Sequence, residues 1–129
     1  MNGVNLLICD DDEDTRALMS QMFKTHGFNV RLASTGTEAL DAMMEGDVQI
    51  ALMDIDLPDR SGLEVARVIR SQNLFVRPSL IAVTGRTEPA QCAEATEAGF
   101  DLYLVKPVTM RQLLTAMTTI PDPTDRLAS

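Results

Sequence analysis

The stretch Ile50-Ala51-Leu52-Met53-Asp54 is a short apolar run that ends at a carboxylate. Two other stretches have the same form: Leu6-Leu7-Ile8-Cys9 ends at Asp10-Asp11, and Leu102-Tyr103-Leu104-Val105 ends at Lys106. Short apolar runs that alternate with helical patterns are typical of buried parallel strands, and ligands of an open α/β sheet gather at the carboxyl ends of its strands. The three runs therefore predict carboxylates and an ammonium group at one edge of a parallel sheet.

The rest of the chain repeats a strand pattern followed by a helical pattern five times. Asp12 or Asp14 is expected to cap the first helix, and Gly27 to end it. Strands are expected at residues 4–9, 28–33, 48–53, 79–83 and 101–105, and helices at residues 13–25, 35–45, 63–69, 89–98 and 109–118. Because parallel strands are joined by right-handed crossovers, this alternation predicts a doubly wound α/β sheet.

The composition limits the domain organisation and the partners. The 129 residues suit one compact domain, expected at residues 1–120, and residues 121–129 are expected to form a flexible tail or the start of a linker. A net charge of −8 argues against direct binding to nucleic acid, which needs clustered lysine and arginine. No apolar stretch has the length of a signal peptide or a membrane span, so we expect a cytoplasmic protein without membrane contact.

The charged strand ends also predict a type of chemistry. Asp10, Asp11, Asp54 and Lys106 are costly to bury together unless another charge compensates the carboxylates. A hard divalent cation is the natural compensator, and beside an aspartate it most often serves phosphoryl transfer.

Further motifs follow the strand ends in a fixed order. Beyond the acidic pair, the chain carries Asp54-x-x-x-Pro58-x-x-x-Gly62, then Thr84 after the fourth strand pattern, and Lys106-Pro107 after the fifth. With these motifs, residues 4–118 resemble the receiver domain of two-component response regulators. The resemblance implies a flavodoxin-like (βα)5 fold with strand order 2-1-3-4-5.

The resemblance also implies a function for the acidic residues. Asp54 is expected to accept a phosphoryl group from a phosphohistidine on a sensor histidine kinase or a histidine phosphotransfer protein. Mg²⁺, which Mn²⁺ can replace, is expected to be bound directly by Asp11, Asp54 and the main-chain carbonyl of Asp56. Asp10 is expected to act mostly through water.

Two other strand-end residues complete the expected catalytic set with Asp54. Lys106 would place a fixed positive charge on the phosphoryl oxygens, and Thr84 would donate a hydroxyl hydrogen bond to them. The Lys106–Pro107 peptide bond is expected to be cis, which would aim the lysine into the site.

The signalling change is expected to begin at Thr84, which moves toward the phosphoryl group. Tyr103 occupies the position of the aromatic residue that rotates behind Thr84 in the family, but a half-exposed edge tyrosine without a switching role is an equal alternative. The surface at residues 88–118 is expected to report the change, and a homodimer formed on phosphorylation and a protein effector are both left open as outputs. The chain is expected to catalyse its own modification and slow dephosphorylation and not to be a turnover enzyme.

Asp56 and Arg86 lie two residues beyond Asp54 and Thr84 respectively. The resemblance implies that both positions flank the phosphoryl group and influence how easily water reaches it. We therefore expect the two side chains to face each other, form an ion pair and slow the access of water to a phosphorylated Asp54. The alternative is two solvated charges with little effect.

A phosphohydrolase of the haloacid-dehalogenase type is the main alternative function, because Asp54-Ile55-Asp56 matches its opening Asp-x-Asp. Pro58 stands where that motif has threonine or valine, and the acidic pair comes first in the chain rather than last. A flavodoxin-like cofactor binder is less favoured, since no phosphate-binding loop rich in glycine and hydroxyl groups follows residues 4–9.

Overall fold

The computed structural model describes residues 2–74 and 76–120. Strands and helices alternate along the chain, as the sequence predicts. They are β1 (Asn5–Cys9), α1 (Glu13–Thr25), β2 (Asn29–Ala33), α2 (Gly36–Met44), β3 (Ile50–Met53), α3 (Gly62–Ser71), β4 (Ser79–Thr84), α4 (Pro89–Ala98), β5 (Leu102–Val105) and α5 (Met110–Met117). The expected tail at residues 121–129 lies outside the described residues.

The five strands form one parallel sheet in the order β2-β1-β3-β4-β5. This order confirms the predicted flavodoxin-like doubly wound fold. The register aligns the last residues of neighbouring strands: Cys9 pairs with Met53, and Thr84 pairs with Val105. The residues that follow β1, β3 and β5 therefore lie along the same edge of the sheet.

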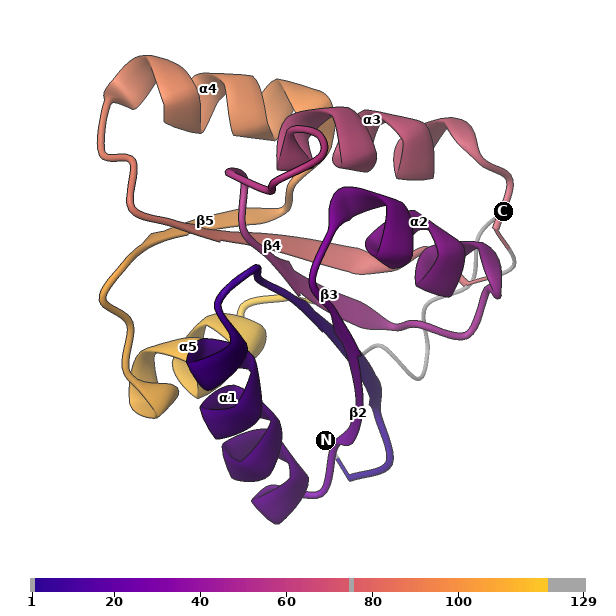
Figure 1. Ribbon diagram of the computed structural model, residues 1–129, viewed down its shortest axis with the longest axis vertical. Helices are drawn as coiled ribbons and strands as arrows, with labels where there is room; N and C mark the ends of the chain where they lie inside the picture. The colour runs from indigo at the N-terminus through magenta and orange to yellow at the C-terminus, as the bar shows by residue number, and fades with distance from the viewer. Residues whose placement is uncertain (1, 75, 121–129) are drawn as a thin grey trace.

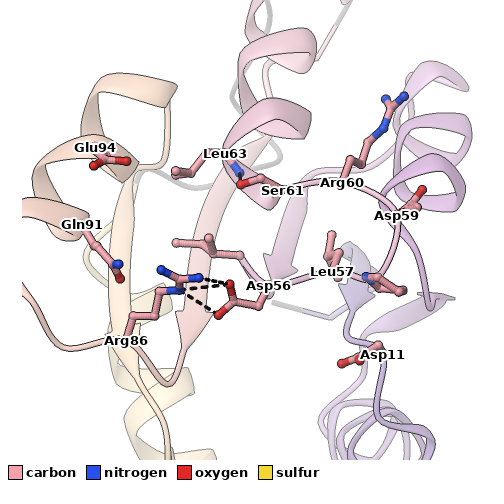
Figure 2. A pocket seen from close by; sticks show the side chains of 12 residues that line it. Asp11, Asp56, Leu57, Asp59, Arg60, Ser61, Leu63, Arg86, Gln91 and Glu94 are labelled. Atoms are coloured by element: carbon pink, nitrogen blue, oxygen red, sulfur yellow. Dashed lines mark hydrogen bonds and ion pairs between the residues drawn. The ribbon is translucent and has the colours of Figure 1, made fainter.

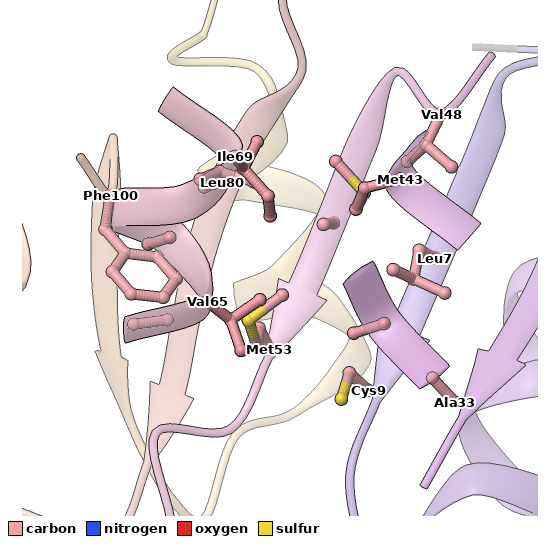
Figure 3. Close-up of a cluster of buried hydrophobic side chains, with 14 of the residues drawn as sticks. Leu7, Cys9, Ala33, Met43, Val48, Met53, Val65, Ile69, Leu80 and Phe100 are labelled. Atoms are coloured by element: carbon pink, nitrogen blue, oxygen red, sulfur yellow. The ribbon is translucent and has the colours of Figure 1, made fainter. Parts of the chain in front are cut away.

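The helices cover the two faces of the sheet in two layers. Figure 1 shows α1 and α5 on one face and α2, α3 and α4 on the other. Strands β1, β3 and β4 are buried on both faces, so successive side chains enter two separate cores. Under α2 and α3, Leu7, Met53 and Leu80 pack with Val65 and Ile69 (Figure 3).

The second core lies between the sheet and the helices α1 and α5. Its largest fully buried side chain is that of Phe23 of α1. The ring of Phe23 meets the ring of Phe28 edge to face, with centroids 5.2 Å apart and planes at 84°. This packing holds α1, and so the turn that follows β1, against the sheet.

Local signals place the helix ends close to where the sequence predicts them. Asp12 rather than Asp14 caps α1, since its carboxylate accepts a hydrogen bond from the Thr15 main-chain amide. Thr35 caps α2 through the amide of Glu38, so this helix begins one residue later than the predicted boundary. Within the described residues, no helix is long and apolar enough to cross a membrane.

Candidate functional site

Three strand ends bring Asp10, Asp54 and Lys106 together. The Lys106 Nζ atom donates hydrogen bonds to Asp10 Oδ2 at 2.8 Å and to Asp54 Oδ2 at 2.9 Å. Both aspartates are buried, whereas the lysine side chain is 34% exposed. The ammonium group therefore links β1, β3 and β5 at the edge where parallel-sheet proteins bind their ligands.

Asp11 completes a cluster of carboxylates at this edge. One ligand oxygen each from Asp10, Asp11 and Asp54 lies within 4.8 Å of the other two. Asp11 is exposed, so the cluster opens to solvent on one side. Closely spaced carboxylate oxygens are the donors that Mg²⁺ prefers, and an open side leaves room for the waters that it retains. The residues present therefore fit a magnesium ion.

Lys106 compensates only part of the negative charge in this cluster. Burial alone would lower the pKa of Lys106, but the hydrogen bonds to Asp10 and Asp54 outweigh that cost and raise the pKa above its ordinary value. Lys106 thus stays protonated, and three carboxylates face one ammonium group. The Lys106–Pro107 peptide bond is cis, as the family resemblance implies.

Main-chain amides orient the two buried carboxylates. The amide of Asp12 donates to Asp10 Oδ1 at 2.9 Å, and the amide of Asp56 donates to Asp54 Oδ1 at 3.0 Å. Each carboxylate thus uses one oxygen for an amide and the other for Lys106. Arg16 of α1 also donates to the main-chain carbonyl of Asp10 at 2.8 Å. This contact of Arg16 is not predicted from the sequence, because a position one turn into a helix gives no signal of it.

The β3–α3 loop is closed close to Asp54. The Gly62 amide donates to the Ile55 carbonyl at 2.7 Å, and a β-bridge joins Asp56 to Ser61. A Cβ atom on residue 62 would lie 2.5 Å from the Asp54 main-chain oxygen. Only glycine permits this close approach, which accounts for the Asp54-to-Gly62 spacing in the sequence.

Thr84, Arg86 and Tyr103 are connected by hydrogen bonds. Thr84 is fully buried, and its Oγ1 accepts a hydrogen bond from the Arg86 main-chain amide at 3.3 Å. The Tyr103 hydroxyl donates to the main-chain carbonyl of Arg86 at 2.8 Å. Tyr103 is half-buried and packs against the core under α3 and α4. Arg86 therefore stands between Thr84, where the signalling change is expected to begin, and Tyr103, for which a switching role and an edge position without one are equal alternatives.

The Arg86 side chain turns in the other direction, toward Asp56. Its guanidinium group donates to both carboxylate oxygens of Asp56, at distances of 2.7–3.0 Å (Figure 2). This contact confirms the predicted ion pair. The hydrogen bonds from Arg86 lower the pKa of Asp56, and those to Asp56 raise the pKa of Arg86. The pair borders a polar pocket that Asp11 also lines.

Asp59 attaches the same loop to α2, a contact that the sequence does not predict. Its carboxylate accepts hydrogen bonds from the Gly36 amide at 2.7 Å, the Thr37 amide at 3.0 Å and the Thr37 hydroxyl at 2.7 Å. These bonds, that of the Thr37 hydroxyl foremost, lower the pKa of Asp59 to about 2. A single loop aspartate gives no sequence signal for partners more than twenty residues away.

An apolar groove of about 730 Å³ adjoins Lys106 on the other side of the site. Leu18, Met19 and Met22 of α1 line one wall, and Pro107 and Met110 belong to the other. Leu18 is 60% exposed.

The site and the fold match one family of known proteins. A model of the response regulator receiver domain matches residues 6–118. The transcriptional regulatory protein GltR of Pseudomonas aeruginosa is 34% identical over 113 residues, which cover 88% of this chain and 47% of GltR. The chain spans about half the length of the curated relatives it matches.

Solved structures give the same result for the fold. A CheY-like response regulator receiver domain protein from Methanospirillum hungatei superposes with a TM-score of 0.83 at 30% identity, over 92% of this chain and 93% of its own. A second match is a chain from a Saccharomyces cerevisiae co-crystal structure. That structure contains the histidine phosphotransfer signaling protein Ypd1 and the receiver domain of its downstream response regulator Ssk1. The matching chain has a TM-score of 0.82 at 27% identity. That match covers 91% of this chain and 88% of the other.

Proposed function

Because the chain belongs to the response regulator receiver domain family, we propose that Asp54 accepts a phosphoryl group from a phosphohistidine of a partner protein. The partner is a sensor histidine kinase or a histidine phosphotransfer protein, and the reaction depends on Mg²⁺ or Mn²⁺. Receiver domains act as signalling switches rather than turnover enzymes. The modified chain is therefore itself the product.

The observation that carries the proposal is the shared contact of Lys106 with Asp10 and Asp54 beside Asp11. An aspartate oxygen attacks phosphorus only where the repulsion between its charge and the phosphoryl oxygens is neutralised. Here Asp54 lies beside one fixed cation and within a cluster that fits a second.

A bound metal ion would supply positive charge to the phosphoryl oxygens during transfer. We propose that Asp11, Asp54 and the Asp56 main-chain carbonyl bind it directly, and that Asp10 acts mostly through water. Receiver domains bind Mg²⁺ at an acidic pocket, and the carboxylate cluster of this chain supports the assignment.

The reaction makes one bond and breaks one bond. A carboxylate oxygen of Asp54 attacks the phosphorus, the bond from phosphorus to the histidine nitrogen breaks, and the electron pair stays on the imidazole. The Asp56 amide holds Oδ1 of Asp54 in a fixed orientation. The Lys106 ammonium, already within hydrogen-bond distance of Asp54 Oδ2, then stabilises charge on the transferred group.

The apolar groove beside Lys106 is a suitable docking surface for the phosphodonor. Receiver domains interact with histidine kinases or phosphotransfer proteins. We propose that a partner helix packs on Leu18, Met19 and Met22, which brings its phosphohistidine to the open side of the carboxylate cluster. We place this exchange in the cytoplasm, without contact to a membrane or directly to nucleic acid.

Phosphorylation would reach the rest of the molecule through Thr84. When the Thr84 hydroxyl turns to donate to the phosphoryl group, Arg86 must adjust, because its amide donates to Thr84 Oγ1. Tyr103 must then adjust too, since its hydroxyl donates to the Arg86 carbonyl. We propose that this change is displayed on the surface at residues 88–118, to an effector protein or a second copy of the chain.

Acetyl phosphate with Mg²⁺ tests the phosphoacceptor directly. We expect the wild-type protein to gain the mass of one phosphoryl group, stable in acid and labile in base, on the peptide that contains Asp54. The Asp54→Asn variant should gain none, because an amide cannot form the acyl phosphate. Labelling of the wild type at another residue, or turnover of acetyl phosphate without a stable adduct, would contradict the proposal.

The ion pair between Asp56 and Arg86 is expected to prolong the life of phosphorylated Asp54. It closes one side of the loop beside Asp54, so replacing either residue with alanine should admit water more readily. We expect the phosphoryl group to be lost about two to five times faster, since an exposed ion pair contributes at most about 1 kcal/mol. The measurement is the decay of the labelled mass after acetyl phosphate is removed.

Two controls accompany that measurement. The double variant should decay no faster than either single variant, because both changes break one contact. Arg77→Ala removes an exposed arginine whose ion pair with Asp101 lies at the opposite edge of the sheet, and its decay should match that of the wild type. Equal lifetimes in all the variants would show that the pair contributes nothing.

A further inference from the structure

We propose that Asp59 is a positioning residue for the metal site, acting as a clamp between the β3–α3 loop and the first turn of α2. The inference rests on the proposed function and concerns how the main-chain groups around Asp54 are held. Asp59 itself is exposed and is not proposed to touch the metal or the phosphoryl group.

The clamp is built from three hydrogen bonds to one carboxylate. The Gly36 amide, the Thr37 amide and the Thr37 hydroxyl all donate to Asp59. The first two amides of a helix have no partner inside the helix, so a carboxylate from another segment is an effective acceptor. The side chain of Thr35, the helix's own cap, accepts from the amide of Glu38, and the amides of Gly36 and Thr37 donate to Asp59 instead.

The neighbouring residue strengthens the attachment. The Arg60 side chain lies directly over Gly36, where a Cβ atom would overlap its methylene groups. Two consecutive loop residues are thus fixed on the first turn of α2, one by hydrogen bonds and the other by packing. Gly36 is buried, which is consistent with this close contact.

The attachment reaches Asp54 through a short and closed path. Between Asp56 and Ser61 the loop is closed by a β-bridge, and Gly62 donates to Ile55 at its base. Asp56 lies at the start of this loop, and its amide donates to Asp54 Oδ1. Its carbonyl is the proposed main-chain metal ligand. A loop fixed at Asp59 therefore holds both main-chain groups of Asp56 in place before the metal binds.

Residues that orient metal ligands without touching the metal commonly change affinity by about 10–100-fold when replaced. We expect Asp59→Ala to weaken Mg²⁺ binding about tenfold, measured on the unphosphorylated protein by titrating its amide NMR signals around Asp54. The Gly62 amide should also exchange with solvent faster, because the loop opens more often. Labelling by acetyl phosphate should slow at low Mg²⁺ and recover at saturating Mg²⁺.

Loss of a negative charge alone could also weaken Mg²⁺ binding, and two variants separate the causes. Thr37→Val removes one hydrogen bond to Asp59 without changing any charge, and should weaken binding about two- to fivefold. Asp41→Asn removes a carboxylate from an exposed position of α2 and should leave the affinity unchanged. The Asp59→Ala effect should persist at about 1 M salt, where the Debye length is only about 3 Å.

The outcomes distinguish the clamp from the proposed function. If the wild type neither binds Mg²⁺ nor is labelled at Asp54, the proposed function is wrong. If the wild type does both, and if Asp59→Ala and Thr37→Val each bind Mg²⁺ as tightly as the wild type does, the clamp is wrong. If Asp59 had a purely structural role, replacing it would lower the free energy of unfolding without changing the Mg²⁺ affinity. If Asp59→Ala fails to fold, the Mg²⁺ affinity of Thr37→Val still distinguishes the two roles.

Discussion

A Lys106→Met variant is expected to be labelled by acetyl phosphate about 10²–10³ times more slowly than the wild type. Lys106 is the fixed cation beside Asp54, and removal of one preorganised group that stabilises charge in a transition state typically costs this factor. The rate of mass gain at saturating Mg²⁺ is the measurement. Lys24→Met, the same substitution at the other lysine of the chain, should be labelled at the wild-type rate.

The same variant is expected to be less stable without metal. Removing one partner of a buried ion pair costs about 3–5 kcal/mol. Because Lys106 is 34% exposed and water screens part of its charge, we expect the free energy of unfolding to fall by about 1–3 kcal/mol. Urea denaturation in the presence of EDTA, which removes divalent cations, measures this loss. Mg²⁺ should restore most of this loss, because the cation replaces the missing charge between Asp10 and Asp54. Equal stability of the variant and the wild type in EDTA would show that Lys106 does not stabilise the cluster.

The pH dependence of this contribution has a definite sign. The pKa of Lys106 is raised in the folded state, so its stabilising effect is fully present below the pKa of an unfolded lysine, about 10.4. The contribution is lost as the pH rises through the higher folded-state pKa. The difference in unfolding free energy between wild type and Lys106→Met should therefore stay constant near neutral pH and shrink only in strongly alkaline solution.

A Phe23→Ala variant is expected to lose about 3–5 kcal/mol of unfolding free energy, a large share of the stability of a domain this size. Its ring is fully buried between α1 and the sheet, and its removal leaves a cavity and ends the edge-to-face contact with Phe28. Urea unfolding without Mg²⁺ measures the loss.

Leu18→Ala is the matched control, because Leu18 lies on the same helix and is 60% exposed. Its unfolding free energy should remain within about 0.5 kcal/mol of the wild-type value. If Phe23→Ala unfolds at the same urea concentration as Leu18→Ala, Phe23 does not hold α1 on the sheet.

The principal residues of the site were predictable because each follows a strand. Asp10, Asp54, Thr84 and Lys106 come directly after apolar runs or end one, and a parallel sheet brings such positions to one edge whatever the details of packing. The ion pair of Asp56 and Arg86 was predictable from the family resemblance, since both residues lie two positions beyond strand-end groups and flank the phosphoryl group in the family.

Contacts that depend on packing between distant segments were not predictable in this way. Arg16 reaches the Asp10 carbonyl, Asp59 reaches α2, and Tyr103 reaches the Arg86 carbonyl. Each contact needs a particular side-chain rotamer and a particular distance between elements. Neither hydrophobic period nor motif spacing contains that information.

The sequence by itself determined the alternation of elements, the parallel sheet and the residues at its carboxyl edge, because strand period and strand ends are local properties of the chain. Tertiary structure alone decided which groups orient those residues. It places the Asp12 and Asp56 amides on the two buried carboxylates, and Lys106 between them. A hydrogen bond requires its atoms within about 3 Å, and that closeness arises only when the two helical layers have packed on the sheet.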